Sequence, residues 1–461
     1  MNPPTFPHSK AEISDKVARP VMPRRILHGA VWILLYVALV AFPVVVLLAG
    51  RLPKGGGYGW DFAMALGFGG LAMLGLQSVL TARFRRATAP FGIDIIYYFH
   101  RWAAVAGVGL VLAHYLILKV RYPAALGSMV PWRAPWPMTA GRTALILFAI
   151  LLISSLWRKT FRLEYDRWRI VHAVLAVAAV VLAIAHIWGV NYYTAAAWKG
   201  GVWGAYTALW VLVVGYVRLA RPLTLLRRPY SVVDVRKERG RSWTVTVRPE
   251  AHGGFRFRPG QFAWLTLRQS PFSAKEHPFS ISSSAESSAL LQFTIKELGD
   301  FTRTIGQVKA GERAYVDGPH GVFTTDYYPD APSLVFVAGG IGIAPIMSIL
   351  RTLADRGDPR PMRLIYGNRR WDNVVFREAI DEIASRIHLK VVHVLEEPPT
   401  DWKGLQGVLN ESVMRTALAG SLEGTVFFVC GPKPMSDSVQ RTLGKLGVPM
   451  RQVHCELFDM A

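Results

Sequence analysis

Cysteine is nearly absent from this sequence, and its scarcity excludes two kinds of site. Among 461 residues only Cys430 and Cys455 are cysteines. An iron–sulfur cluster bound by protein thiolates needs about four, so this chain does not supply one. Both cysteines lie in the half that we expect to face the reducing cytosol, where structural disulfides are rare.

Negative charge is also scarce. The chain has 31 Asp and Glu against 53 Lys and Arg, which gives a formal net charge of +22. A chain this basic could bind nucleic acid, but it contains no nucleic-acid-binding motif. We interpret the excess as a basic collar beside anionic lipid, because the arginines gather at the ends of apolar segments.

Long apolar runs are missing from the second half of the chain and frequent in the first. Six segments are long enough to cross a hydrocarbon core of about 30 Å at about 1.5 Å per residue. The first is too long for the apolar part of a signal peptide, so we expect it to be retained. The predicted spans are at about 26–49, 60–82, 95–118, 140–157, 168–190 and 201–220.

The basic residues predict the orientation of these spans. One set of span ends carries most of the arginines, among them Arg83, Arg158 and Arg169, and the opposite ends carry fewer. The side of a membrane protein that is rich in arginine and lysine is usually cytoplasmic. We therefore expect a bacterial inner-membrane protein whose two termini, including an arm at 1–25, are cytoplasmic.

Four histidines lie inside predicted spans, where ionisable groups are costly and usually functional. His100 and His114 are fourteen residues apart in the third span, and His172 and His186 repeat that interval in the fifth. Fourteen residues return to nearly the same helix face. The third and fifth spans run in the same direction, so His100 should face His172 near the cytoplasm and His114 should face His186 near the outside.

Two stacked imidazole pairs without cysteine or carboxylate beside them suit haem iron better than zinc. Gly107 and Ala179 lie midway between the histidines of each span and would leave room for a porphyrin. Two alternatives stay open, namely core histidines bonded to backbone carbonyls and members of a proton relay.

After about residue 229 the pattern changes to short alternating segments with Gly and Pro between them, which predicts a small antiparallel barrel. The segment "SLVFVAGGIGIAPIMSILRTLAD" then combines an apolar strand, a glycine-rich turn and a helix. Further alternation of strands and helices predicts a doubly wound α/β domain. The glycines of the turn would let backbone amides approach a pyrophosphate.

Three motifs follow one another in this half: "HPFS" at 277–280, "GGIGIAP" at 339–345 and "CGPKPM" at 430–435. Their order resembles the ferredoxin–NADP reductase-like flavoprotein module. Together with six spans and paired histidines, the chain resembles the ferric reductase and NADPH oxidase superfamily. The resemblance implies a six-span α-helical membrane bundle at 26–220, an antiparallel β-barrel FAD domain at 229–326 and an α/β doubly wound NADPH domain at 332–461.

The resemblance also assigns residues to cofactors. It places Ser280 near the reactive nitrogen of FAD, Phe279 on the flavin ring, Cys430 beside the nicotinamide and Phe458 over the flavin face, and so Ser280, Cys430 and Phe458 are the candidate catalytic residues. The residues expected at FAD are His277, Pro278, Phe279, Ser280, Ser282, Ser283, Gly299, Thr302 and Phe458. Those expected at the nicotinamide nucleotide are Gly339, Gly340, Gly342, Pro345, Cys430, Gly431 and Pro432.

Two arginines bear on the choice of nucleotide. Arg369 and Arg370 follow the second strand of the α/β domain, where a ribose 2′-phosphate would lie, and no acidic residue stands there in the sequence to hold a 2′-hydroxyl. This favours NADPH over NADH, although NADH remains possible. The alternative is a solvated basic loop.

The expected function is electron transfer from cytosolic NADPH through FAD and two haem b groups to an acceptor outside. With histidine on both sides of each iron, the acceptor should react at the haem edge. Dioxygen giving superoxide is the first choice, and a ferric or cupric chelate is the runner-up. A hypothesis of another class is a histidine-lined proton channel with a regulatory nucleotide domain. The sequence gives no sign of an obligatory protein subunit.

Overall fold

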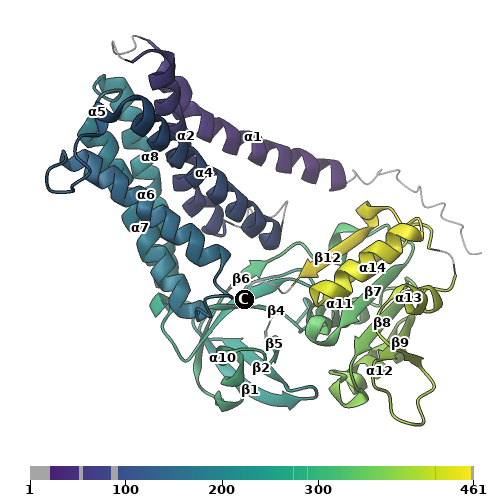
Figure 1. The fold of residues 1–461 in the computed structure, drawn as a ribbon. Coiled ribbons are helices and arrows are strands. Elements are labelled where there is room, and N and C mark those ends of the chain that lie inside the picture. The colour runs from purple at the N-terminus through teal and green to yellow at the C-terminus, as the bar shows by residue number, and fades with distance from the viewer. Residues whose placement is uncertain are drawn as a thin grey trace, which may run out of the picture.

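The computed structural model describes residues 21–50, 56–84, 92–273, 275–287, 289–420 and 422–457. Most of the predicted arm at 1–25 and the candidate Phe458 lie outside the described residues. A bundle of long helices forms one part of the molecule, and two domains built on sheets form the other (Figure 1). The chain passes from the bundle to the first sheet through one continuous helical segment, Ala197–Leu226.

Six helices of the bundle are long and apolar enough to cross a membrane, which confirms the predicted number of spans. Most agree with the predicted ranges, but the last one continues to Leu226 through a short π-helical stretch, Tyr216–Ala220. The helices are α1 (Val21–Leu48), α2 (Tyr58–Thr81), α4 (Ile93–Arg121), the short α5 (Pro123–Leu126), α6 (Trp136–Leu156), α7 (Tyr165–Val190), α8 (Ala197–Gly215) and α9 (Arg221–Leu226).

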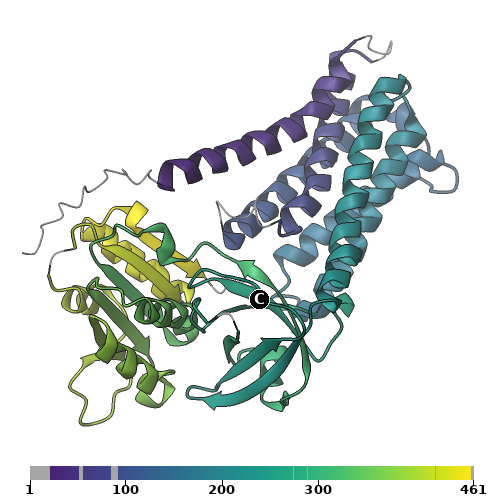
Figure 2. The same cartoon turned by 180° about the vertical axis from the view of Figure 1, so that it is seen from behind.

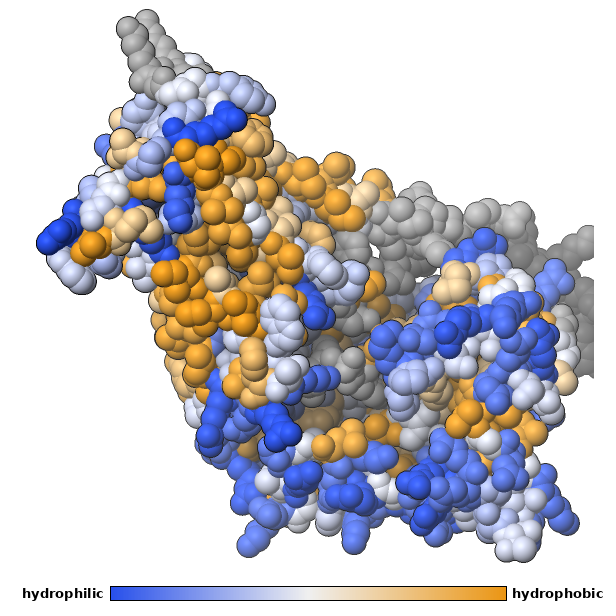
Figure 3. Space-filling view, viewed as in Figure 1, coloured by the Kyte–Doolittle hydropathy of each residue, from blue (hydrophilic) through white to orange (hydrophobic). Residues whose placement is uncertain are grey.

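The outer surface of the bundle is apolar. Large hydrophobic side chains such as Leu34, Val174 and Leu212 are exposed on it. Figure 3 shows this as an apolar band over the helices, beside a mostly hydrophilic surface on the sheet domains. Burying such a surface in lipid removes a large unfavourable contact with water, so the bundle is the membrane part of the chain.

The first sheet is antiparallel and curled, as expected for the flavin domain. Its strand order is β4-β3-β6-β1-β2-β5, and a bridge between Ile281 and Phe293 brings its two edges together. Its core contains Val245, Leu265, Phe293 and Ile295. The strands are β1 (Tyr230–Glu238), β2 (Ser242–Pro249), β3 (Phe262–Leu267), β4 (His277–Ser280), β5 (Leu291–Lys296) and β6 (Arg313–His320), with the short helix α10 (Asp300–Arg303) after β5.

The second sheet is parallel, with the order β10-β9-β8-β7-β11-β12. Alternate residues of its strands point to opposite faces: Phe336 and Phe428 pack with α11 and α12, while Val337 and Val429 pack with α13 and α14. This confirms the doubly wound prediction. Its elements are β7 (Leu334–Gly339), α11 (Ile343–Asp355), β8 (Met362–Asn368), α12 (Arg377–Arg386), β9 (Leu389–Leu395), β10 (Leu405–Gln406), α13 (Glu411–Ala417), β11 (Val426–Gly431), α14 (Lys433–Lys445) and β12 (Val453–Leu457).

Two membrane helices begin against the flavin-type sheet. Ile93, at the start of α4, packs on Phe262 and Trp264 of β3. Asp166, at the start of α7, lies 3.7 Å from His277 of β4. The first turns of α4 and α7 are therefore at the end of the bundle that faces the sheet domains, as both views of the ribbon show (Figures 1 and 2).

Candidate functional site

The four predicted histidines lie on two helical hairpins, α2 with α4 and α6 with α7. His100 and His172 are close enough to interact electrostatically, and so are His114 and His186. His100 and His172 are near the starts of α4 and α7, which touch the flavin-type sheet. The structure thus brings the histidines together in two pairs, one close to the sheet domains and one far from them.

The pair far from the sheets is held by backbone carbonyls. His114 Nδ1 donates to the Ala63 carbonyl at 2.8 Å, and His186 Nδ1 donates to the Pro137 carbonyl at 2.8 Å. A carbonyl can only accept, so both rings carry their proton on Nδ1 and leave Nε2 as a lone-pair donor. Both rings line a cavity of about 140 Å³, whose walls are mostly apolar side chains such as Phe68, Phe148 and Leu145.

The pair near the sheets is held differently. His172 Nδ1 lies 3.3 Å from the hydroxyl of Ser155 on α6. The Nδ1 atom of His100 is buried and has no hydrogen-bond partner. The indole ring of Trp168, one turn before His172 on α7, has its centroid 5.0 Å from that of the imidazole.

The two imidazole pairs fit haem iron, for which they would be the ligands. Imidazoles that donate from Nδ1 to a carbonyl are the usual form of a metal-bound histidine. Among the described residues no cluster of three or more His, Cys, Asp or Glu side chains could hold a metal ion, so the set that zinc requires is not formed there. Two facing imidazoles beside an apolar cavity, as in the outer pair, fit bis-histidine haem coordination.

Gly107 serves another purpose than the one predicted for it. A Cβ atom at this position would lie 2.9 Å from Leu74 Cγ of α2. Gly70 faces it from α2, where a Cβ would lie 3.1 Å from the Gly107 carbonyl oxygen. The space is filled by close packing of α2 on α4, so the prediction that Gly107 makes room for a porphyrin is wrong.

Buried charges join the bundle to the flavin-type sheet. We call Arg83, Arg221, Glu276, Asp317 and His320 the junction cluster. The Glu276 carboxylate, one residue before the HPFS motif, lies 2.9 Å from Arg83 and 3.3 Å from Arg221. Arg221 also pairs with Asp317, which His320 contacts at 3.4 Å. The Arg83 guanidinium lies 3.3 Å from the centroid of the Trp264 ring.

The two carboxylates of the junction cluster remain ionised. Burial acts to raise the pKa of Glu276, but the charges of Arg83 and Arg221 outweigh it and hold that pKa below its usual range. Burial likewise opposes ionisation of Asp317, yet the hydrogen bond from His320 and the charge of Arg221 lower its pKa. The cluster is therefore an ionic contact that fixes the strand β4 against the ends of α2 and α9.

The HPFS motif forms β4. His277 stacks on Phe301 with ring centroids 3.8 Å apart, and Phe279 lies 6.1 Å from the same ring. Pro278 pairs with Trp264 of β3. The hydroxyl of Ser280 is buried without a hydrogen-bond partner in the protein, as expected of a group that hydrogen-bonds to a ligand.

Three other residues expected at FAD have their hydroxyls engaged within the protein. The Ser282 hydroxyl bonds to the Gln292 carbonyl at 3.2 Å, and the Ser283 hydroxyl accepts from the Gln292 amide at 3.3 Å. The Thr302 hydroxyl accepts from the amides of Leu298 and Gly299, both at 2.8 Å. These side chains shape the loops, and any contact with a ligand there would come from the backbone or require rearrangement.

The glycine-rich turn and the CGP segment meet at the carboxyl ends of β7 and β11. A Cβ at Gly342 would lie 2.2 Å from the Cys430 carbonyl oxygen, and one at Gly339 would lie 2.4 Å from Met435 Sδ. Gly340 has a φ of +52°, which favours glycine. Strand order reverses between β7 and β11, and nucleotides bind at such a switch point.

Other predicted residues surround this turn. Pro345 lies in the first turn of α11 and is buried. Gly431 and Pro432 lead from β11 into α14, and a Cβ at Gly431 would lie 2.6 Å from Met435 Cε. Cys430 is fully buried, and burial raises the pKa of its thiol. It is a neutral, compact side chain beneath the turn.

Arg369 and Arg370 are exposed and share one partner. Each donates from Nε to the Glu397 carboxylate at 2.7 Å. The prediction that no acidic residue stands beside these arginines is therefore wrong. Sequence reasoning missed Glu397 because it follows β9 rather than β8, although both strands are parallel neighbours that end at the same edge.

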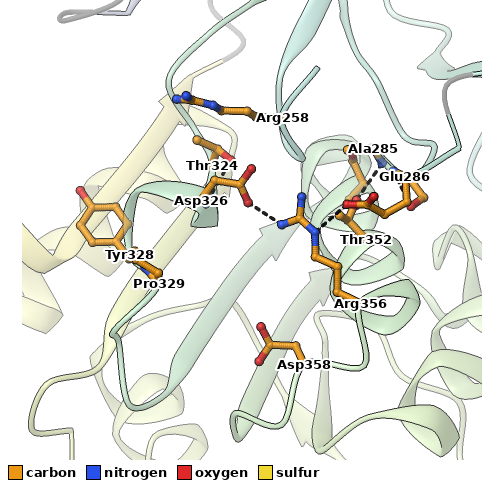
Figure 4. Close-up of polar contacts among 12 residues, drawn as sticks. Arg258, Ala285, Glu286, Thr324, Asp326, Tyr328, Pro329, Thr352, Arg356 and Asp358 are labelled. Carbon is orange, nitrogen blue, oxygen red and sulfur yellow. Dashed lines mark hydrogen bonds and ion pairs between the residues drawn. The ribbon is translucent and has the colours of Figure 1, made fainter. Parts of the chain in front are cut away.

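Helix α11 connects the nucleotide turn to the segment after the HPFS motif. The Ser348 hydroxyl donates to the Ser283 carbonyl at 2.8 Å, and Thr352 accepts from the Ala285 amide at 2.9 Å. Arg356 bridges Glu286 and Asp326 at 2.7 Å each (Figure 4). The two sheet domains are thus fixed to each other along one helix.

Three family models match successive parts of this chain. Residues 66–183 match the ferric reductase-like transmembrane component, residues 230–322 match an FAD-binding domain, and residues 336–441 match the oxidoreductase NAD-binding domain. The first match contains His100, His114 and His172 and ends three residues before His186. The second contains the HPFS motif, and the third contains the glycine-rich turn and the CGP segment.

Curated relatives cover the sheet domains. The chain is 31% identical over 156 residues to NADH-cytochrome b5 reductase 1 of Candida glabrata, covering 33% of this chain and 54% of that one. It is 31% identical over 224 residues to the ferredoxin reductase component of a 3-ketosteroid-9-alpha-monooxygenase from Rhodococcus rhodochrous, covering 48% and 61%. The chain thus spans less than two thirds of these relatives.

Among solved structures, a ferredoxin reductase in carbazole 1,9a-dioxygenase covers 50% of this chain and 69% of its own, with 28% identity and a TM-score of 0.44.

Proposed function

Since this chain is a membrane oxidoreductase with the architecture of the ferric reductase and NADPH oxidase superfamily and a ferredoxin–NADP reductase-like module, we propose that it transfers electrons from NADPH to an acceptor across the membrane. FAD and two haem b groups would be the carriers. The nucleotide and flavin domains would lie in the cytoplasm of a bacterial cell. In this proposal the membrane domain spans 26–220, the FAD domain 229–326 and the NADPH domain 332–461.

The observation that carries the proposal is the arrangement of the two histidine pairs. His100 and His172 lie about two turns from the starts of helices that touch the flavin-type sheet, and His114 and His186 lie fourteen residues further along the same helices. FAD, when bound, converts the two-electron chemistry of nicotinamide into one-electron transfer, which haem iron requires. The vertical order of the pairs gives electrons a route through an insulating bilayer.

The chain's own residues would hold these groups in order. We assign Ser280 to hydrogen-bond the flavin, because its hydroxyl is buried and unpartnered. His277 and Phe279 would border the flavin ring, and the turn at Gly340 and Gly342 would offer backbone amides to the nucleotide pyrophosphate. Cys430 would border the nicotinamide. The roles of Gly299, Thr302 and Phe458 at FAD remain predictions.

Each imidazole pair would hold a haem iron and would leave the acceptor no free coordination site on the metal. The acceptor would then take an electron at the outer haem edge. We favour dioxygen, because a small diffusible oxidant needs no binding site of its own. Exposed cations near the outer end of α4, Lys119 and Arg121, favour an anionic ferric or cupric chelate as the second candidate.

Superoxide dismutase distinguishes the two acceptors. With dioxygen as acceptor, NADPH consumption by the purified protein proceeds without added metal. Dismutase then abolishes cytochrome c reduction and leaves NADPH consumption unchanged. Turnover that starts only when a ferric chelate is added would assign the protein to the chelate reductases.

Replacement of one outer ligand tests the vertical order. In His114→Leu we expect NADPH to reduce the flavin at the parent rate, and only the haem of His100 and His172 to be reduced afterwards. Anaerobic stopped-flow absorbance follows both events in one trace. His100→Leu is the matched control. It removes a ligand of the haem nearer to the flavin, so neither haem should be reduced. Loss of flavin reduction itself in His114→Leu would contradict the order.

A further inference from the structure

The two histidine hairpins are built on one repeated plan. The intervals from Ala63 to Pro137 and from Gly67 to Gly141 on α2 and α6 are equal, and the interval between His114 and His186 nearly matches them. The residues one level closer to the sheets keep the same interval, Gln77 with Leu151 and Thr81 with Ser155. Helices α2 and α6 therefore offer equivalent positions to the histidines of α4 and α7 at each level.

At the outer level the plan combines a carbonyl and a glycine. Each imidazole donates to a helix carbonyl, that of Ala63 or Pro137, and the residue four positions later is Gly67 or Gly141. A carbonyl has a second lone pair beyond the one used in its helix, and the missing side chain leaves that lone pair open. The rings lie directly over the glycines.

The fit over the glycines is close. A Cβ at Gly67 would lie 3.0 Å from His114 Nδ1, and a Cβ at Gly141 would lie 2.8 Å from His186 Nδ1. A methyl group at Gly141 would have to displace the imidazole or its helix, and at Gly67 the required shift is smaller. The bond to the carbonyl and the contact with the glycine together fix the ring plane.

At the inner level a hydroxyl takes the place of the glycine. Ser155 donates to the Leu151 carbonyl and lies 3.3 Å from His172 Nδ1. Thr81 occupies the equivalent position on α2 and donates to the Gln77 carbonyl at 3.0 Å. The serine hydroxyl thus stands between the helix carbonyl and the imidazole.

We propose that Gly67 and Gly141 are positioning residues for the outer histidines and that Ser155 is the positioning residue for His172. The outer ligands are oriented by carbonyls exposed through glycine, and one inner ligand is oriented through a hydroxyl. This inference rests on the proposed function, because it concerns imidazoles that bind iron. Each residue acts on the haem through its histidine.

Alanine at Gly141 tests the outer level. We expect Gly141→Ala to lose the outer haem or shift its low-spin electron paramagnetic resonance signal, with the haem content falling from two toward one per polypeptide. Gly67→Ala should cause a smaller shift of the same signal. His114→Leu and His100→Leu assign the two signals beforehand. Gly109→Ala on α4 is the matched control, because a Cβ there meets nothing within 4 Å.

Alanine at Ser155 tests the inner level, and here the inner haem should change while the outer haem stays as in the parent. Ser155→Ala should shift the signal and midpoint potential of the inner haem alone, and Ser155→Thr should restore the parent values. The inference is overturned by parent-like signals in both Gly141→Ala and Ser155→Ala, or by equal changes of both haems in each variant. A parent protein without haem would overturn the proposed function as well, so the two failures are distinguishable.

Discussion

Gly342 is required by the backbone that faces it. Alanine there would place a Cβ 2.2 Å from the Cys430 carbonyl oxygen. Because that oxygen belongs to the backbone of β11, the clash could be relieved only by a shift of the strand or of the turn. We expect Gly342→Ala to destabilise the nucleotide domain by about 1–3 kcal/mol and to impair flavin reduction by NADPH. Thermal unfolding and stopped-flow kinetics measure the two effects.

Gly444→Ala is the control for that prediction. Gly444 lies in α14, and a Cβ there meets nothing within 4 Å. Since alanine favours helix more than glycine does, this variant should be as stable as the parent or more stable. An equal loss of stability in both variants would mean that the domain is destabilised by any added methyl group and that Gly342 is not specifically required in the turn.

Glu397 should oppose the binding of NADPH. Its carboxylate occupies the two guanidinium groups that would otherwise meet a 2′-phosphate. We expect Glu397→Gln to raise kcat/KM for NADPH and to leave that for NADH unchanged. A loss confined to NADH would instead mean that Glu397 holds the ribose hydroxyl.

The arginines give the complementary result. Arg369→Ala combined with Arg370→Ala should lower kcat/KM for NADPH at least about tenfold more than for NADH, as expected from the loss of a charge-assisted contact to phosphate. An equal loss for both nucleotides would assign the arginines to the fold or to the shared pyrophosphate.

Some residues of the site could be predicted from sequence, and others could not. The four histidines were visible because a fixed interval along a helix places both on one face. Glu397, Ala63 and Pro137 were not, because their roles depend on contacts between neighbouring strands or helices. Gly107 misled the prediction, since its interval fits a porphyrin as well as it fits the helix packing that it makes.

At the scale of elements, the junction cluster fixes β4 to the bundle. Glu276 is buried between Arg83 and Arg221, so Glu276→Gln leaves the buried Arg83 guanidinium without its ion-pair partner, while Arg221 keeps Asp317. Breaking a buried pair in this way costs about 3–5 kcal/mol. We expect normal flavin reduction by NADPH but slower haem reduction, which stopped-flow absorbance resolves. Asp437→Asn, which breaks an exposed pair with Lys433, should change neither rate.

The same carboxylate predicts an acid-sensitive junction. The pKa of Glu276 is lowered in the folded protein, so its stabilising effect is complete above the ordinary value of 4.5 and is lost as the pH falls below that. Haem reduction in the parent should therefore slow on acidification below this value relative to flavin reduction. In Glu276→Gln this part of the pH dependence should be absent, and its persistence would point to another group.

Helices and strands followed from local patterns, but their ends did not. Apolar length predicted the six spans, and alternation predicted most strands of the two sheets but not β4, β10 or β12. The last span was predicted to stop at about residue 220. The helix continues to Leu226, since Arg221 finds its partners Glu276 and Asp317 in the flavin-type sheet. A contact this distant in sequence gives no local signal.

At the scale of the whole molecule, the central claim is that the bundle carries two haems in series above a flavin. The claim depends on two histidine pairs at two depths, with the nearer pair close to the starts of helices that touch the flavin-type sheet. The proton-channel hypothesis uses the same four histidines but requires no iron. The two hypotheses therefore predict a different haem content of the purified protein as well as a different activity.

The most direct test is the absorbance spectrum of the protein purified from its membrane, taken oxidised and reduced, with the haem-to-polypeptide ratio. We predict two haems per chain with the sharp Soret and α bands of six-coordinate, low-spin bis-histidine iron, and one haem in His114→Leu. A parent protein that contains FAD but no haem, with all four histidines intact, would contradict the account.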